Sequence, residues 1–310
     1  MKSSKNGQAA LHALKRPRFA KDVSEKSRSA GLGWWGERSP RDEFLQKTRP
    51  IKQSGSRGPL DPTNCQTRSK EVAEHLISAA ENLRKTIERL RFGKPVAYVY
   101  NPLNYAWAPY EKYVRKFGCS RKRVVFLGMN PGPFGMIQTG VPFGEVAAVR
   151  DWLGIEATVN RPRRAHPLRP VSGFACARSE VSGQRLWGLF AEQFGEAATF
   201  FAEHLVMNYC PLAFVEESGR NRTPDKLLSS EKQRLFVCCD EHLRAIIGAL
   251  KPEWLIGIGD FAYGRAKQVL GDSDVKIMRI LHPSPASPAA NKNWKEIVTS
   301  QLCEAGVWNL

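Results

Sequence analysis

Four apolar runs, separated by segments with helical periodicity, organise the chain after residue 120. The runs are rich in Val, Ile, Leu and Phe, as is typical of strands that are buried on both faces of a sheet. They cover residues 123–129, 204–210, 253–259 and 275–281. Helical patterns lie around 144–154, 182–194, 224–250 and 260–271, and another helix is expected to begin near Pro288. This alternation predicts an α/β fold with a parallel sheet covered on both faces.

The pattern is different at the N-terminal end. Residues 1–68 are rich in Ser, Gly, Lys and Arg and lack periodicity, so we expect a disordered basic tail there. Apolar residues then recur at helical spacing from Val72 to Leu90, before Gly93 and Pro95 end that segment. The domain after the tail is therefore expected to span 69–310.

The net charge of +17 is unevenly distributed. Residues 1–70 hold 16 Lys and Arg against 6 Asp and Glu, which is more than half of the excess. A basic excess of this size favours a polyanionic partner, either nucleic acid or an anionic membrane surface. Because no apolar run approaches the roughly 18 to 20 residues of a membrane-spanning helix, nucleic acid is the stronger alternative and no membrane partner is expected.

Two features of the basic tail bear on localisation and partners. Lys15-Arg16-Pro17-Arg18 fits a nuclear address or a loose nucleic-acid contact, and a solvated tail explains it equally well. Trp34-Trp35 is either a docking element or an aromatic pair without function. The basic N-terminus lacks the apolar core of a signal peptide, whereas a mitochondrial presequence stays open because no acidic residue precedes Asp22. We expect a nuclear protein.

The seven cysteines form no Cys-x-x-Cys pair, and Cys238 and Cys239 fall within a helical pattern. This usage favours free thiols in a reducing compartment over a disulfide framework or a metal site.

Candidate chemistry follows the ends of the predicted strands. The run that ends at Leu127 continues into a rigid loop that contains Asn130, and the last run continues into His282-Pro283-Ser284-Pro285. Asn208 lies near the end of the strand predicted at 204–210. Because ligands of open α/β sheets bind beyond the carboxyl ends of the strands, these side chains are expected to form one crevice.

Three motifs resemble those of the single-strand-selective monofunctional uracil-DNA glycosylases. They are Gly-Met-Asn-Pro-Gly-Pro-Phe-Gly-Met at 128–136, Gln-Thr-Gly-Val-Pro-Phe-Gly-Glu at 138–145, and His-Pro-Ser-Pro at 282–285 with Asn291-Lys292. The resemblance covers roughly Val96 to Trp308. It implies a three-layer α/β/α sandwich with a four-stranded parallel sheet, and a repair enzyme that excises uracil and 5-substituted uracils such as 5-hydroxymethyluracil.

The resemblance also implies roles for individual residues. Asn130 would position the attacking water, and His282 would donate a hydrogen bond to the leaving base. The base would be bound by four residues: Met129, Gly132, Phe143 and Asn208. The DNA backbone and the space left by the base would be contacted by a segment containing Ser284, Ala286, Ser287, Asn291 and Lys292. Within it, Ser287-Pro288 is typical of an N-cap followed by proline in the first helical turn, whose backbone N–H groups can receive a phosphate.

Ala286 departs from the family pattern, since vertebrate members carry an arginine wedge at its position. Neither signature loop contains a lysine nucleophile, so the expected product is an intact abasic site. No metal or organic cofactor is implied. The expected partners are single- and double-stranded DNA and downstream abasic-site repair enzymes, and the protein is expected to be a monomer.

Two other functions fit parts of the sequence. Gly257-Ile258-Gly259-Asp260-Phe261-Ala262 follows a predicted strand and satisfies a dinucleotide-binding pattern, although the acidic residue expected further on is not evident. The basic charge also fits a noncatalytic nucleic-acid-binding protein.

Overall fold

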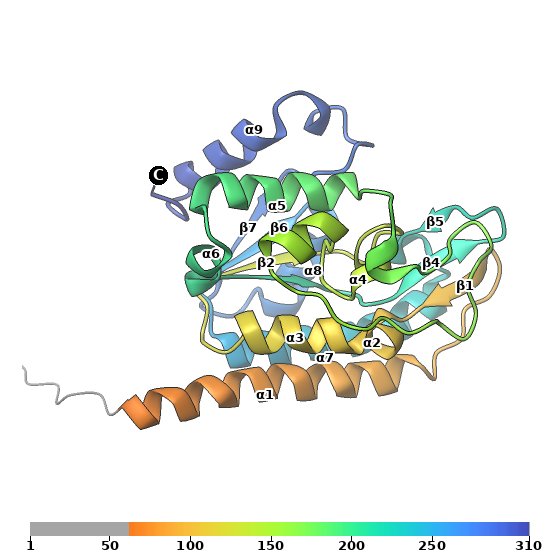
Figure 1. Cartoon of the computed structure of the whole chain (residues 1–310), viewed down its shortest axis with the longest axis horizontal. Coiled ribbons are helices and arrows are strands. Elements are labelled where there is room, and N and C mark those ends of the chain that lie inside the picture. The colour runs from red at the N-terminus through yellow and green to blue at the C-terminus, as the bar shows by residue number, and fades with distance from the viewer. Residues whose placement is uncertain (1–61, 310) are drawn as a thin grey trace, which may run out of the picture. The chain divides into compact units, whose positions relative to one another are not determined.

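Four parallel strands form the centre of the fold (Figure 1). The computed structural model describes residues 62–309, and side chains from Glu71 onward. The strands are β2 (Val124–Gly128), β3 (His204–Asn208), β6 (Trp254–Ile258) and β7 (Lys276–Ile280), in the order β3-β2-β6-β7. Each lies within one of the predicted apolar runs and ends within two residues of its bounds, so the predicted strands are confirmed.

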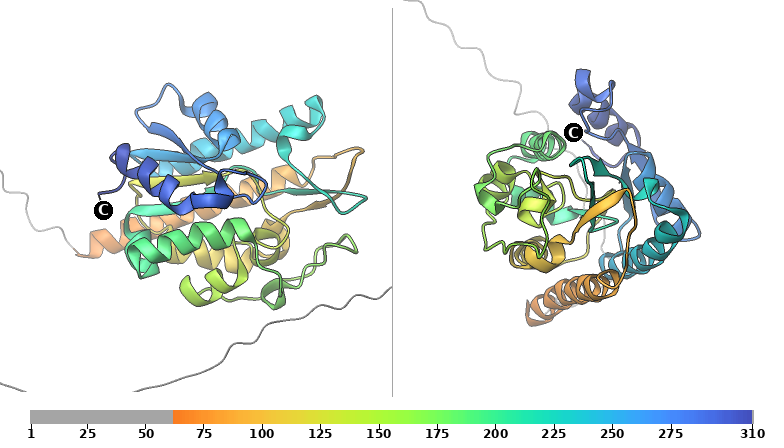
Figure 2. Two further views of the ribbon diagram at one scale, coloured as in Figure 1. Left: turned by 90° about the horizontal axis from the view of Figure 1, so that it is seen from above. Right: turned by 90° about the vertical axis from the view of Figure 1, so that its right-hand side faces the viewer.

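Helices cover both faces of this sheet, which confirms the three-layer arrangement (Figures 1 and 2). On one face lie α5 (Val181–Phe194) and α9 (Ala290–Glu304), which pack together. On the other lie α3 (Trp107–Phe117), α7 (Ser229–Leu250) and α8 (Asp260–Leu270), and α1 (Pro62–Ile87) packs against α3 and α7. The shorter helical elements are α2 (Pro102–Tyr105), α4 (Met136–Thr139), η1 (Ala148–Trp152), η2 (Gly173–Ala175), α6 (Ala197–Glu203) and η3 (Pro224–Lys226).

The predicted helices differ from the observed ones mainly at their starts. The pattern at 224–250 breaks because Leu227 and Leu228 are extended, so α7 begins only at Ser229. The pattern at 144–154 gives the π-helix η1. The helix α1 begins at Pro62, before the expected domain boundary. Residues 1–61, with the basic motif at 15–18 and the tryptophan pair at 34–35, lie outside the described residues.

A second, antiparallel sheet was not predicted. It has the order β1-β4-β5 and comprises β1 (Val96–Tyr100), β4 (Ala213–Glu216) and β5 (Asn221–Arg222). Its strands have two to five residues, and β1 and β5 are only partly buried, so they show no continuous apolar run. Since β4 follows β3 closely, this sheet lies beyond the carboxyl ends of the parallel strands (Figure 1).

None of the described helices is long and apolar enough to cross a membrane. The six cysteines with described side chains are free thiols, and α7 contains both Cys238 and Cys239 as predicted.

Two buried histidines make the fold sensitive to acid. The Nδ1–H of His204 donates to the Phe200 carbonyl at 2.8 Å, and its Nε2 accepts from the Trp308 indole at 3.1 Å, which fits a neutral ring. Burial lowers the pKa of His204 and of His242 to about 4. Between pH 4 and about 6.5 the unfolded chain therefore binds more protons than the folded chain.

We expect the free energy of unfolding to be highest above about pH 6.5 and to fall toward pH 4, by on the order of 2 kcal/mol for each histidine. Urea denaturation at pH 7.5 and 5 measures this loss. His204→Asn should reduce the difference between the two pH values. An equal difference in this variant would contradict the assignment to His204.

Candidate active site

The pairing of β2 with β3 brings the first motif beside Asn208. Gly128 is the register partner of Asn208. Two backbone hydrogen bonds continue the pairing past the ends of the strands: the Tyr209 N–H donates to the Gly128 carbonyl and the Cys210 N–H to the Met129 carbonyl, both at 2.9 Å. The amide nitrogen of Asn130 donates to the Leu212 carbonyl at 3.1 Å. This bond fixes the Asn130 amide by its nitrogen, so its oxygen Oδ1 is the end that can orient a water molecule.

Asn208 has an unused acceptor near the Phe143 ring. Its side chain is buried and its Nδ2 lies 3.3 Å from the Met136 sulfur, while its buried Oδ1 has no hydrogen-bond partner among the described residues. A Cβ at Gly128 would overlap both this oxygen and the Phe143 ring, so only glycine permits their close approach. The amide can therefore serve a ligand edge that presents one donor and one acceptor.

Phe143 is held in an unusual backbone conformation by helix α5. Its φ of 51° lies in the left-handed region, and its carbonyl accepts a bond from the Trp187 indole at 2.9 Å. Gly183 lets the helix approach this carbonyl closely. The centroids of the Phe143 and His282 rings lie 6.2 Å apart, so the aromatic ring and the imidazole are neighbours in the candidate site.

His282 is a neutral hydrogen-bond donor. The backbone N–H of Ser284 donates to Nδ1 at 3.0 Å, so in the neutral ring the proton is on Nε2. Desolvation lowers the pKa of His282 to about 4, which keeps the ring neutral at pH 7. Gly259, at φ 86°, would place a Cβ 3.1 Å from the His282 Cβ. The two glycines of the dinucleotide-binding pattern therefore have a packing role. Gly259 makes room for the His282 side chain, and Gly257 makes room for the backbone of Tyr263.

Glu180 was missed by the sequence analysis and lies against the first motif. A Cβ at Gly132 or at Gly135 would overlap one of its carboxyl oxygens, so the two glycines accommodate this side chain. Its Oε2 is buried without a hydrogen-bond partner in the described part of the chain. Burial, with a smaller contribution from Glu145, raises the pKa of Glu180 to about 7. Glu180 lies 44 residues after the end of the motif at 128–136, and no local sequence pattern marks it.

The segment after His282 is a folded turn with an exposed outer surface. The Ala286 N–H donates to the Ser284 hydroxyl at 3.2 Å, and the Asn291 amide donates to the Pro285 carbonyl at 2.8 Å. Ala286, Asn291 and Lys292 are exposed, whereas Ser284 and Ser287 are half-buried.

The expected N-cap at Ser287 is wrong, because α9 begins at Ala290 and Ala289 is its cap. Two successive backbone turns, from Ser284 to Ser287 and from Ser287 to Ala290, separate this serine from the helix. The helix N-terminus at which a phosphate was expected therefore lies at Ala290, two residues after Pro288.

Arg185, also missed, ties this segment to α5. Its guanidinium donates to the Pro283 carbonyl and to the Asn291 side-chain oxygen, each at 3.0 Å. A residue on a helix far away in the sequence thus positions the loop that carries His282.

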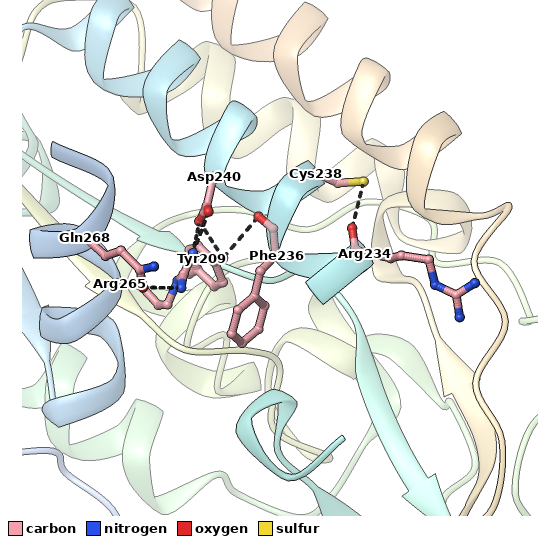
Figure 3. Close-up of polar contacts among 7 residues, drawn as sticks. All are labelled: Tyr209, Arg234, Phe236, Cys238, Asp240, Arg265 and Gln268. Carbon is pink, nitrogen blue, oxygen red and sulfur yellow. Dashed lines mark hydrogen bonds and ion pairs between the residues drawn. The ribbon is translucent and has the colours of Figure 1, made fainter. Parts of the chain in front are cut away.

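Behind the site, a polar network anchors the end of β3 (Figure 3). The Tyr209 hydroxyl donates to Asp240 of α7 at 2.7 Å, and the same carboxylate pairs with Arg265 of α8. The Arg265 guanidinium also lies over the Phe236 ring, 4.5 Å from its centroid. Since Tyr209 follows Asn208 directly, this network fixes the backbone that carries the Asn208 amide.

Comparisons with known proteins show the family and support the fold. The family model described as the uracil DNA glycosylase superfamily matches residues 115–303. The chain is 44% identical over 241 residues to a rat protein, Single-strand selective monofunctional uracil-DNA glycosylase, covering 77% of this chain and 87% of the relative. The mouse protein of that name is 43% identical over 250 residues, which is 80% of this chain and 88% of the relative. The crystal structure of wild-type Pedobacter heparinus SMUG2 aligns with a TM-score of 0.55 at 15% identity, covering 74% of this chain and 97% of that one, which supports the fold. The chain therefore belongs to the uracil-DNA glycosylase superfamily and, within it, to the single-strand selective monofunctional uracil-DNA glycosylases.

Proposed function

We propose that the protein is a monofunctional DNA N-glycosylase that hydrolyses the bond between uracil and deoxyribose and leaves an abasic site. The observation that carries the proposal is that Asn208 and neutral His282 both lie beside the Phe143 ring, while the loop that follows β2 holds Asn130 by its bond to the Leu212 carbonyl. An extruded base fits such a pocket, because its faces can stack on an aromatic ring while its edges meet polar groups.

The chemistry follows from the charge that develops as the bond breaks. Electrons of the N-glycosidic bond move into the uracil ring, chiefly onto O2 and O4. The Nε2–H of His282 stabilises the anion at O2 without giving up its proton, since a neutral imidazole is a poor acid. Asn130 holds the water below the sugar, and because an amide is a weak base it acts by orienting the water toward an oxocarbenium-like centre. The proton that the water loses as it adds to the sugar goes to the departing uracil anion or to solvent.

Asn208 reads the base. Its free Oδ1 accepts from N3–H and its Nδ2 donates to O4, whereas cytosine presents an acceptor at N3 and a donor at its 4-amino group. Uracil thus satisfies the buried amide, and cytosine would leave it unpaired.

We extend the proposal to uracils with a substituent at C5, such as 5-hydroxymethyluracil. Gly132 has no side chain, and the Glu180 carboxyl occupies the space that a Cβ at this glycine would take. The hydroxyl of a hydroxymethyl group can donate a hydrogen bond, and a carboxyl oxygen of Glu180 can accept it.

Gly132→Tyr should lower excision of 5-hydroxymethyluracil by about tenfold or more, and at least as much as that of uracil, because the ring obstructs the C5 side. Tyr at 132 would also collide with Glu180, so the control is the double variant with Glu180→Ala, which removes that collision. Single-turnover rates on both bases measure the effect. If the double variant excised both bases at the normal rates, the effect of Tyr at 132 would come from its collision with Glu180 and not from contact with the base.

The proposal includes duplex DNA, where the turn at 283–292 would fill the space left by the flipped base. Ala286→Arg should raise the single-turnover rate on duplex substrate, because a long side chain offsets part of the unstacking cost of a few kcal/mol. Matched single-stranded substrate needs no opening and should show little change. Equal changes in the rate on both substrates would show that residue 286 does not fill the space left by the flipped base.

We further propose that the protein acts in nuclear base excision repair as a monomer and passes its abasic product to downstream enzymes. The basic composition supports a DNA partner. The mechanism uses side chains of the chain itself and calls for no metal or cofactor.

Incubation with labelled oligonucleotides that contain uracil, 5-hydroxymethyluracil or cytosine, followed by alkali, tests the proposed activity. Scission is expected at the two uracils alone, in single and double strands. Binding without scission would instead support a noncatalytic nucleic-acid-binding protein.

A further inference from the structure

A groove of about 660 Å³ lies outside the residues assigned above. Its walls come from the end of α1, from β1 and from the segment 160–164. Four arginines line it, Arg91, Arg161, Arg163 and Arg164, against one carboxylate, Glu88. The groove is therefore basic.

The arginines of the segment 160–164 are available to an anion. Arg161, Arg163 and Arg164 are exposed, and within residues 71–309 no carboxylate forms an ion pair with them. The Arg164 guanidinium lies 5.1 Å from the centroid of the Tyr98 ring, which also lines the groove. A charged guanidinium beside an aromatic face suits both a phosphate and a stacked base.

Asn101, which also lines the groove, contains an unsatisfied amide. Both its Nδ2 and its Oδ1 are buried, and neither has a hydrogen-bond partner among the described residues. Leaving a buried polar atom unpaired costs about 1–3 kcal/mol, so such an amide calls for a partner that offers both a donor and an acceptor. The edge of a nucleobase has this pattern.

The groove adjoins the active site through a single residue. Leu212 lines the groove, and its carbonyl accepts the bond from Asn130. Figure 1 shows β1 and β4 on the same side of the sheet as α4, which follows the Asn130 loop. A DNA strand whose flipped nucleotide lies at Asn130 can therefore continue into the groove.

We propose that this groove binds the substrate strand next to the flipped nucleotide. Arg161, Arg163 and Arg164 bind its phosphates, and Asn101 and Tyr98 bind one unpaired base. This proposal rests on the proposed function and adds the path that the DNA strand follows. Single-stranded DNA can take this path because the edge of an unpaired base can form hydrogen bonds with the Asn101 amide.

The test is a triple variant, Arg161→Gln with Arg163→Gln and Arg164→Gln. The matched control replaces Arg121, Arg234 and Arg244 with Gln, which are equally exposed and do not line the groove. Substrates are single-stranded oligonucleotides with uracil at one end or at the other, so that the flanking strand extends in one direction only.

We expect the groove variant to weaken binding by about tenfold or more for one of the two directions, with the maximal single-turnover rate unchanged. The slope of log affinity against log salt should fall by about 2 for the loss of three phosphate contacts. Equal losses in both directions, or in the control variant, would overturn the groove as a strand site. So would competition by a mononucleotide as effective as that by the oligonucleotide, which would make it a site for free nucleotides. Absence of uracil release by the unmodified protein would overturn the proposed function instead.

Discussion

Replacing His282 with Leu is expected to lower the single-turnover rate of uracil excision by about 10² or more, with much smaller loss of DNA affinity. The hydrogen bond from Nε2 strengthens as the base becomes an anion, so its removal acts mainly on the transition state. A factor of 10² corresponds to about 2.7 kcal/mol of lost stabilisation.

The pH dependence distinguishes a neutral donor from an acid. With a pKa of about 4, His282 keeps one charge state between pH 6 and 8, so its titration should contribute no increase in rate as the pH falls through that range. His75→Gln, at an exposed position on α1, is the control and should retain full activity. Near-normal excision by His282→Leu would refute the assignment.

Asn208→Asp is expected to reduce uracil excision by about tenfold or more and to weaken discrimination against cytosine. A carboxylate offers two acceptors, so it cannot donate to O4, and it places a negative charge where the base becomes anionic. Rates on uracil and cytosine substrates measure both effects, with Asn82→Asp on the exposed surface of α1 as the control. Unchanged rate and selectivity would assign base reading to another residue.

The parts of the fold that were predictable are those with a strong local signal. The parallel strands β2, β3 and β6 are buried almost throughout, so their sequences are apolar runs, whereas the edge strand β7 is partly exposed. The residues at the carboxyl ends of parallel strands meet at one edge of the sheet. Strand direction and order are therefore enough to predict that Asn130, Asn208 and His282 lie near one another. Their individual roles came from the resemblance in the motifs.

The missed features depend on contacts between distant segments. Glu180 and Arg185 lie at the start of α5, and nothing near them in the sequence shows that one packs on Gly132 and the other binds the Pro283 carbonyl. Ser287 has the residue type of an N-cap, but the turns that precede α9 take its place. Pattern arguments identified the site, whereas the second sheet and the supporting residues required the structure.

Whether this site hydrolyses an N-glycosidic bond is decided by chromatography with mass detection of the products from a single-stranded uracil oligonucleotide. We expect equal amounts of free uracil and of an unbroken strand with one abasic site. Uracil retained in the DNA, or a strand broken without alkali, would contradict this expectation.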